Sequence, residues 1–184
     1  NPHKWMFTNF DCSAYFVKDK QALIKTFSIL PEYLKTSHDQ VVNNYRDWSV
    51  PLGRRFRSLK LWFVMRSIGI AGMQATLREH VRIGQWLAAQ IEKEDDFELL
   101  APVPLNLICF RYHPLGLNDE AKLNQLNERL LESLNASGKI LLTQTRLNDK
   151  FTIRFVSGNN NTSQAEVEKG WAMIKAYALK LGVQ

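Results

Sequence analysis

The chain has 184 residues, 45% apolar and 23% charged, with a net charge of +6. This composition is typical of a folded globular chain, long enough for one domain or for a small domain plus part of another. The longest apolar runs fall far short of the roughly 20 residues that span a membrane, so we expect no membrane partner. Basic residues are scattered among acidic ones, so we expect no nucleic-acid partner.

The N-terminus and the two cysteines bear on the cellular environment of the chain. The opening residues, Asn1 to Trp5, lack an initiator Met and the layout of a secretory signal. This suggests that a region precedes them and that nothing directs export. Cys12 and Cys109 lie in apolar segments, where buried free thiols are commoner than disulfides. We therefore expect a reducing, cytoplasmic environment.

The first 45 residues are expected to hold a loop, a strand and a long connection. Lys4 falls on a short loop before residues 6–17, whose Phe, Tyr and Val content predicts a buried strand or strand pair. Residues 21–45 have weak periodicity and many polar side chains, which predict a long connection of the kind that often serves as a lid.

The remainder of the chain is expected to form a small α+β unit. From Arg55, apolar residues at three-and-four spacing predict a long helix, interrupted near Gly69 and Gly72 and ending at 94–96. There follow strands at 97–101 and 107–112, a helix at 118–134, strands at 140–145 and 151–156, and a helix from Ser163. Gly138 and the Ser163–Glu166 capping-box spacing mark helix ends.

Lys4 is the candidate for covalent chemistry. A lone Lys most often lies on the surface. Its position beside Trp5 and directly before an apolar segment favours partial burial, which helps to keep an amine neutral, as imine formation requires.

Two blocks of sequence resemble a known family. Asn1-Pro2-His3-Lys4-Trp5, followed by Asn9-Phe10-Asp11-Cys12-Ser13-Ala14, resembles the lysine segment of group II decarboxylases that use pyridoxal 5'-phosphate (PLP). The second block is Tyr45-Arg46-Asp47-Trp48 and then residues 51–62. It is similar in order and spacing to the aromatic-L-amino-acid decarboxylase subgroup. Looser similarity extends the resemblance over essentially the whole chain.

The resemblance implies an α/β architecture, fold type I of the PLP-dependent transferases (aspartate-aminotransferase-like). Residues 1–60 would form the end of the large PLP-binding domain, with the lysine loop and a mobile lid loop. Residues 61–184 would form the small α+β C-terminal domain. The cofactor-stacking His and the Asp facing the pyridine nitrogen would lie upstream, so we expect the isolated chain to be inactive without its N-terminal portion.

The implied activity is decarboxylation of an aromatic L-amino acid to its amine, with Lys4 forming the internal aldimine with PLP. Asn1 and His3 would help to bind the cofactor, although loop-shaping hydrogen bonds explain them equally well. Tyr33, on a loop that reaches the neighbouring subunit, would be the general acid toward Cα. Gly53 would lie near the substrate ring and favour an aromatic side chain over imidazole, and a tight turn is its other interpretation.

The resemblance also implies an obligate homodimer, for which Trp48, Pro51 and Leu52 are candidate interface contacts. Arg54, Arg55 and Arg57 favour ion pairs over anion binding. His38, His80 and His113 lack metal-ligand spacing, so we predict no metal.

Two alternatives remain open. One is an aromatic aldehyde synthase on the same scaffold, in which phenylalanine is expected at the position of Tyr33. The other is a non-catalytic α+β binding module, which would tolerate Lys4→Ala and bind no PLP.

Overall fold

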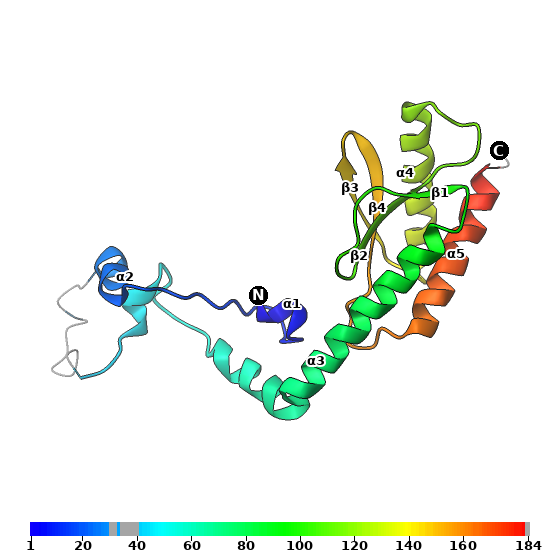
Figure 1. The fold of residues 1–184 in the computed structure, drawn as a ribbon. Coiled ribbons are helices and arrows are strands. Elements are labelled where there is room, and N and C mark those ends of the chain that lie inside the picture. Colours follow the sequence, from blue (N-terminus) through cyan, green and yellow to red (C-terminus); the bar gives the residue numbers. More distant parts are fainter. Residues whose placement is uncertain (30–32, 34–40, 183–184) are drawn as a thin grey trace. The chain divides into compact units, whose positions relative to one another are not determined.

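The computed structural model describes residues 1–29, 33 and 41–182. The chain divides into two compact units, Asn1–Ile70 and Ala71–Gln184. The division falls between Ile70 and Ala71, whereas the predicted domain boundary lies between Lys60 and Leu61. Figure 1 shows the elements of each unit in sequence colours.

The first unit begins with a single helical turn. Helix α1 spans Pro2–Trp5, with Asn1 as N-cap and Pro2 in the first turn, where its missing N–H costs nothing. Lys4 therefore lies on a helical turn and not on the predicted loop. Helix α2, Lys20–Phe27, follows, capped by the Asp19 carboxylate, which accepts from the Gln21 and Ala22 N–H groups at 2.9 and 3.1 Å.

Two predictions for this unit are wrong. Residues 6–17 form no strand, and Phe10 and Phe16 are 84% and 90% exposed. A strand requires a hydrogen-bonded neighbouring strand, and no strand in the described part of the chain pairs with residues 6–17. Helix α2 occupies the start of the predicted long connection, because Asp19 caps its N-terminus. Much of the remaining connection, with His38, lies outside the described residues.

A long helix links the motif region to the second unit. A short 3-10 helix, η2, spans Tyr45–Trp48, and helix α3 spans Arg57–Ile91. Gly69 has φ 73° and ψ 163°, which breaks the helical conformation where the sequence predicts an interruption. A left-handed φ of this kind favours glycine because it has no Cβ.

The second unit is an antiparallel sheet with packed helices, as the sequence predicts. Strands β1 (Phe97–Leu99), β2 (Leu107–Tyr112), β3 (Thr143–Leu147) and β4 (Lys150–Val156) lie in the order β1-β2-β4-β3. Helix α4, Glu120–Ala136, packs on β2, β4 and helix α5, Gln164–Gly182. Gly138 adopts φ 67° just after α4, and the Glu166 N–H donates to Ser163 Oγ at 3.4 Å.

The core of this unit is formed by one face of the sheet and the apolar sides of its helices. Phe151, Ile153 and Phe155 alternate along β4 and are at most 7% exposed. They join the buried side chains of the neighbouring strand and helices, Ile108, Phe110, Leu130, Leu134, Trp171 and Ile174. This core is closed within the second unit.

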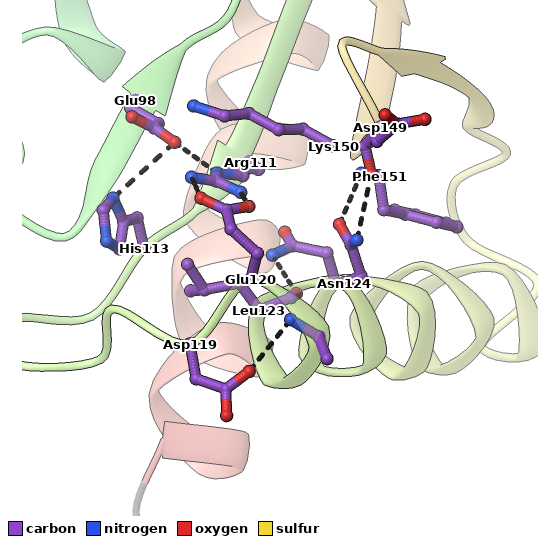
Figure 2. A network of polar contacts seen from close by, with 12 residues as sticks. Glu98, Arg111, His113, Asp119, Glu120, Leu123, Asn124, Asp149, Lys150 and Phe151 are labelled. Carbon is purple, nitrogen blue, oxygen red and sulfur yellow. Dashed lines mark hydrogen bonds and ion pairs between the residues drawn. The ribbon is translucent and has the colours of Figure 1, made fainter.

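A buried arginine ties the sheet to the start of α4. Arg111 on β2 is 1% exposed, and its guanidinium donates to Glu120 at 2.6 and 3.1 Å and also to Glu98 on β1 (Figure 2). His113 Nδ1 lies 3.6 Å from the same Glu98 carboxylate. The hydrogen bond from Arg111 holds the pKa of Glu120 below its ordinary value. A buried charge is tolerated here because two carboxylates compensate it.

Candidate active site

The backbone of the Lys4 turn is closed by local hydrogen bonds. The Lys4 N–H donates to the Asn1 carbonyl at 3.0 Å, and the Phe7 N–H donates to the Lys4 carbonyl at 3.3 Å. Phe7 adopts φ 53°, which reverses the chain directly after the turn. Pro2 and Thr8 are buried, and the Thr8 N–H donates to the Pro2 carbonyl at 3.1 Å. The turn is thus fixed from both sides.

The Lys4 side chain is exposed, and Trp5 beside it is 41% exposed. The predicted partial burial is therefore wrong for this chain, because the apolar segment that follows does not fold back over the lysine. Within the described residues, no carboxylate pairs with the Lys4 amine. An amine without an anionic partner is accessible to an electrophile.

His3 and Asn1 are bound to the chain nine and twelve residues further on, at Cys12 and Ser13. The backbone N–H of Cys12 donates to the ring nitrogen Nδ1 of His3 at 3.2 Å. The backbone N–H of His3 donates to the Cys12 carbonyl at 3.4 Å. Ser13 Oγ donates to Asn1 Oδ1 at 2.9 Å. These are the loop-shaping hydrogen bonds that the sequence left open for both residues. They leave the amide N–H groups of Asn1 without a partner in the described part of the chain.

The two motif blocks meet at an ion pair that the sequence did not single out. Arg57 Nε lies 3.1 Å from each carboxylate oxygen of Asp11, and Nη2 lies 3.1 Å from Oδ2. The hydrogen bond from Arg57 lowers the pKa of Asp11 below its ordinary value, and the same bond raises the pKa of Arg57. The arginine cluster thus forms an ion pair at Arg57, as expected.

Tyr33 and Gly53 are not brought to Lys4 by any contact among the described residues. Tyr33 is 81% exposed, and its immediate neighbours lie outside the description. Gly53 does not have a left-handed φ, and a Cβ built on it would meet nothing within 4 Å. Gly53 lies in a bend with Leu52, and its φ does not require glycine.

The candidate interface residues differ in exposure. Pro51 is exposed and Leu52 is 63% exposed. Trp48 is half-buried, packs edge-on against Tyr45 at 5.2 Å between ring centroids, and has the Lys20 amine 5.5 Å above its ring. Trp48 thus has a packing role within its own unit.

The residues present fit a cofactor that carries both an aldehyde and an anionic group. The Lys4 amine has no counter-ion among the described residues, and the Asn1 amide, three residues before it, retains two unused donors. No three His, Cys, Asp or Glu side chains gather in a metal-binding group within the described ranges. Cys12 and Cys109 are both buried and free, as predicted. In the described part of the chain, every helix is too short or too polar to cross a membrane.

Comparison with known proteins gives one family and many relatives. Residues 1–113 match the model of the pyridoxal-dependent decarboxylase conserved domain. The chain is 42% identical over 180 residues to the aromatic-L-amino-acid decarboxylase of Rattus norvegicus, covering 97% of this chain and 36% of the relative. It is 39% identical to tryptophan decarboxylase 2 of Oryza sativa, covering 98% of this chain and 37% of that protein. The chain thus spans just over a third of the length of these relatives.

A solved structure agrees in fold. Oryza sativa TDC, crystallised with PLP and tryptamine, has a TM-score of 0.91 and 33% identity, over 98% of this chain and 38% of that one. The predicted fold class is confirmed, because this agreement extends through both units of the chain.

Proposed function

Because this chain belongs to the pyridoxal-dependent decarboxylase family, we propose that it is part of an enzyme that decarboxylates an aromatic L-amino acid to its amine. The observation that carries the proposal is the accessible Lys4 amine, on a turn fixed by His3 and Asn1, inside the segment that the family model matches. The relatives named for aromatic substrates support the substrate class.

Each candidate residue has a defined task in this proposal. Bound PLP supplies an electron sink for the electron pair that remains on Cα when carbon dioxide leaves. The Lys4 amine would hold the cofactor covalently, and the Asn1 amide would donate to its phosphate. The His3 ring beside the lysine contributes to cofactor binding and is oriented by Cys12. Tyr33 holds the proton that Cα receives, and Gly53 leaves room for an aromatic ring.

Covalent trapping tests the role of Lys4. Borohydride treatment of the holoenzyme should fix PLP to the peptide that contains Lys4, as seen by mass spectrometry. Lys4→Ala should abolish both the label and the decarboxylase activity, because no other residue in this segment provides a primary amine until Lys18. Lys18→Ala, at an exposed lysine, is the matched control and should retain both. Trapping at a different lysine would show that Lys4 is not the carrier.

We also propose that the enzyme is a cytoplasmic homodimer in which residues 1–60 complete a large domain and 61–184 form a small one. The exposed Tyr33 is free of packing in the described part of the chain, as a residue acting on a partner subunit must be. Heterodimers of Lys4→Ala and Tyr33→Phe subunits should recover about half of wild-type activity per heterodimer, since one of the two sites is intact. Proven heterodimers without recovery would contradict action across the interface.

The aldehyde synthase is the second candidate. The structure of Rhodiola rosea 4-hydroxyphenylacetaldehyde synthase has a TM-score of 0.82 and 28% identity, over 98% of this chain and 36% of that one. The resemblance predicts phenylalanine at the position of Tyr33 in an aldehyde synthase, so the tyrosine favours simple decarboxylation. Oxygen uptake and peroxide formation during turnover distinguish the two reactions, and we expect neither above background.

A further inference from the structure

The lysine segment is anchored to the second motif through one carboxylate. Asp11 is the only acidic residue among the first eighteen, and Arg57 binds it through Nε and Nη2 with N–O distances of 3.1 Å. A guanidinium that contacts both oxygens of a carboxylate fixes their relative orientation as well as their distance. Arg57 is also the first residue of α3, so the anchor point lies on a long helix.

A continuous set of contacts leads from this ion pair to Lys4. Cys12, directly after Asp11, holds the backbone and ring of His3, and its thiol lies 3.9 Å from the Arg57 carbonyl. Ser13, the next residue, holds the side chain of Asn1. His3 and Asn1 flank Pro2 in the turn that carries Lys4.

We infer that Asp11 and Arg57 are positioning residues for Lys4, acting through the Cys12–His3 and Ser13–Asn1 contacts. The inference rests on the proposed function, since Lys4 must carry the cofactor for its position to matter. The ion pair is 38–40% exposed, and exposed pairs of this kind contribute little to stability. Its main effect is therefore geometric: it fixes the position and orientation of the turn that carries Lys4.

The test compares Asp11→Asn, Arg57→Gln and Arg57→Lys in the holoenzyme. Displacing a reacting group by about 1 Å can lower a rate by roughly a hundredfold. We expect kcat to fall about tenfold or more in Asp11→Asn and Arg57→Gln, with KM within about twofold of wild type. The pH titration of the visible absorbance of bound PLP should shift in both. Arg57→Lys keeps the charge but not the paired donors, so it should lie between these variants and wild type.

The double variant Asp11→Asn/Arg57→Gln should be no worse than the more affected single variant, because both remove the same interaction. Arg82→Gln is the matched control. Arg82 binds Glu79 through Nε and Nη2 at 2.7 and 2.6 Å, also on an exposed surface, but no described contact joins that pair to the lysine segment. Its kcat and absorbance titration should equal those of wild type.

The outcomes separate the two claims. If borohydride does not fix PLP to Lys4 in the wild-type enzyme, the proposed function fails. If it does, but Asp11→Asn and Arg57→Gln keep wild-type kcat and absorbance titration, the positioning role is overturned. A lower melting temperature with unchanged kcat per folded enzyme would likewise overturn it. Should either variant fail to fold, the comparison of Arg57→Lys with Arg82→Gln decides by the same readouts.

Discussion

At the scale of single residues, two asparagines on α4 each bond both backbone polar groups of another residue. The Tyr112 N–H donates to Asn127 Oδ1 at 2.7 Å, and Asn127 Nδ2 donates to the Tyr112 carbonyl at 2.8 Å. Asn135 forms the same two-way contact with Leu142, at 2.9 and 3.0 Å. An amide side chain offers both a donor and an acceptor, so it can satisfy the N–H and the carbonyl of one residue at the same time.

Asn127→Ala should be strongly destabilising. Asn127 is fully buried, so its removal leaves the backbone N–H and carbonyl of Tyr112 unsatisfied, at a cost of about 3 kcal/mol. Asn124→Ala is the comparison: Asn124 bonds the Asp149 carbonyl and the Phe151 N–H in the same manner but is only half-buried, so about 1 kcal/mol is expected (Figure 2). Urea unfolding measures both. Equal losses would contradict the role of burial.

Gly53→Ser should change substrate choice without changing stability. Open space around the Cβ position and an ordinary φ predict a free energy of unfolding within about 0.5 kcal/mol of wild type. If Gly53 borders the substrate ring, the ratio of kcat/KM for histidine to that for an aromatic amino acid should rise. Gly84→Ala is the contrast, because its Cβ would lie 2.9 Å from Asn106 Cα and should cost about 1–3 kcal/mol. An unchanged ratio would remove Gly53 from the pocket.

His80 should make stability fall at acidic pH. Its side chain is 2% exposed, and burial lowers its pKa below the ordinary 6.5. The unfolded chain therefore binds a proton in the range below pH 6.5 where the folded chain does not, and stability decreases as the pH falls through that range. His80→Gln removes this contribution. Between pH 7.5 and pH 5, the melting temperature of wild type should thus fall relative to that of the variant. A difference that does not change with pH would contradict this role of His80.

At the scale of elements, the β3–β4 hairpin shows how local chemistry fixes a turn. Asn148 and Asp149 have φ of 50° and 62° between Leu147 and Lys150, which pair with each other. Positive φ at both central positions matches the twist of the flanking strands, and Asn-Gly is the favoured pair there. This turn therefore has the preferred Asn at its first central position but Asp149 in place of the preferred Gly at its second.

Asp149→Gly should stabilise the second unit by about 0.5–1 kcal/mol, because glycine adopts this φ without steric cost. The contacts of Asp149 with Asn124 and Arg146 use its backbone carbonyl and would remain. Thermal unfolding should show a higher melting temperature. Asp149→Ala, which keeps a Cβ in the left-handed region, serves as the control and should not be more stable than wild type.

Prediction of elements from the sequence succeeded where the signal was local. Strand β2 spans the predicted residues, α4 begins two residues late, and the break in α3 falls at Gly69. The failure at residues 6–17 has a physical cause: a strand depends on a partner far away in sequence, whereas a helix closes its own hydrogen bonds.

At the scale of the whole molecule, the two units differ in what they leave exposed. Among the described residues, the large exposed aromatic side chains all belong to the first unit: Trp5, Phe10, Tyr15, Phe16, Tyr33, Tyr45, Phe56, Trp62 and Phe63. The second unit encloses its aromatic residues in its own core. Extended apolar surface promotes association in water.

Expression of residues 1–184 alone should therefore give aggregated or dye-binding protein. A chain of residues 71–184 should remain soluble, since its core is closed without the first unit. Size-exclusion chromatography and a hydrophobic-dye assay compare the two. Monomeric, dye-negative behaviour of the longer chain would show that the exposed aromatics are not a liability.

The sequence by itself determined the family motifs, the candidate lysine and the order of elements in the second unit, because these depend on residue type and short spacing. Tertiary structure decided the rest. It placed Asp11 on Arg57, 46 residues away, and exposed the lysine that the sequence predicted to be partly buried. It also placed Asn127 and Asn135 of α4 against the backbone of Tyr112 and Leu142. Contacts between distant residues depend on how the chain folds back on itself, and no local pattern encodes that path.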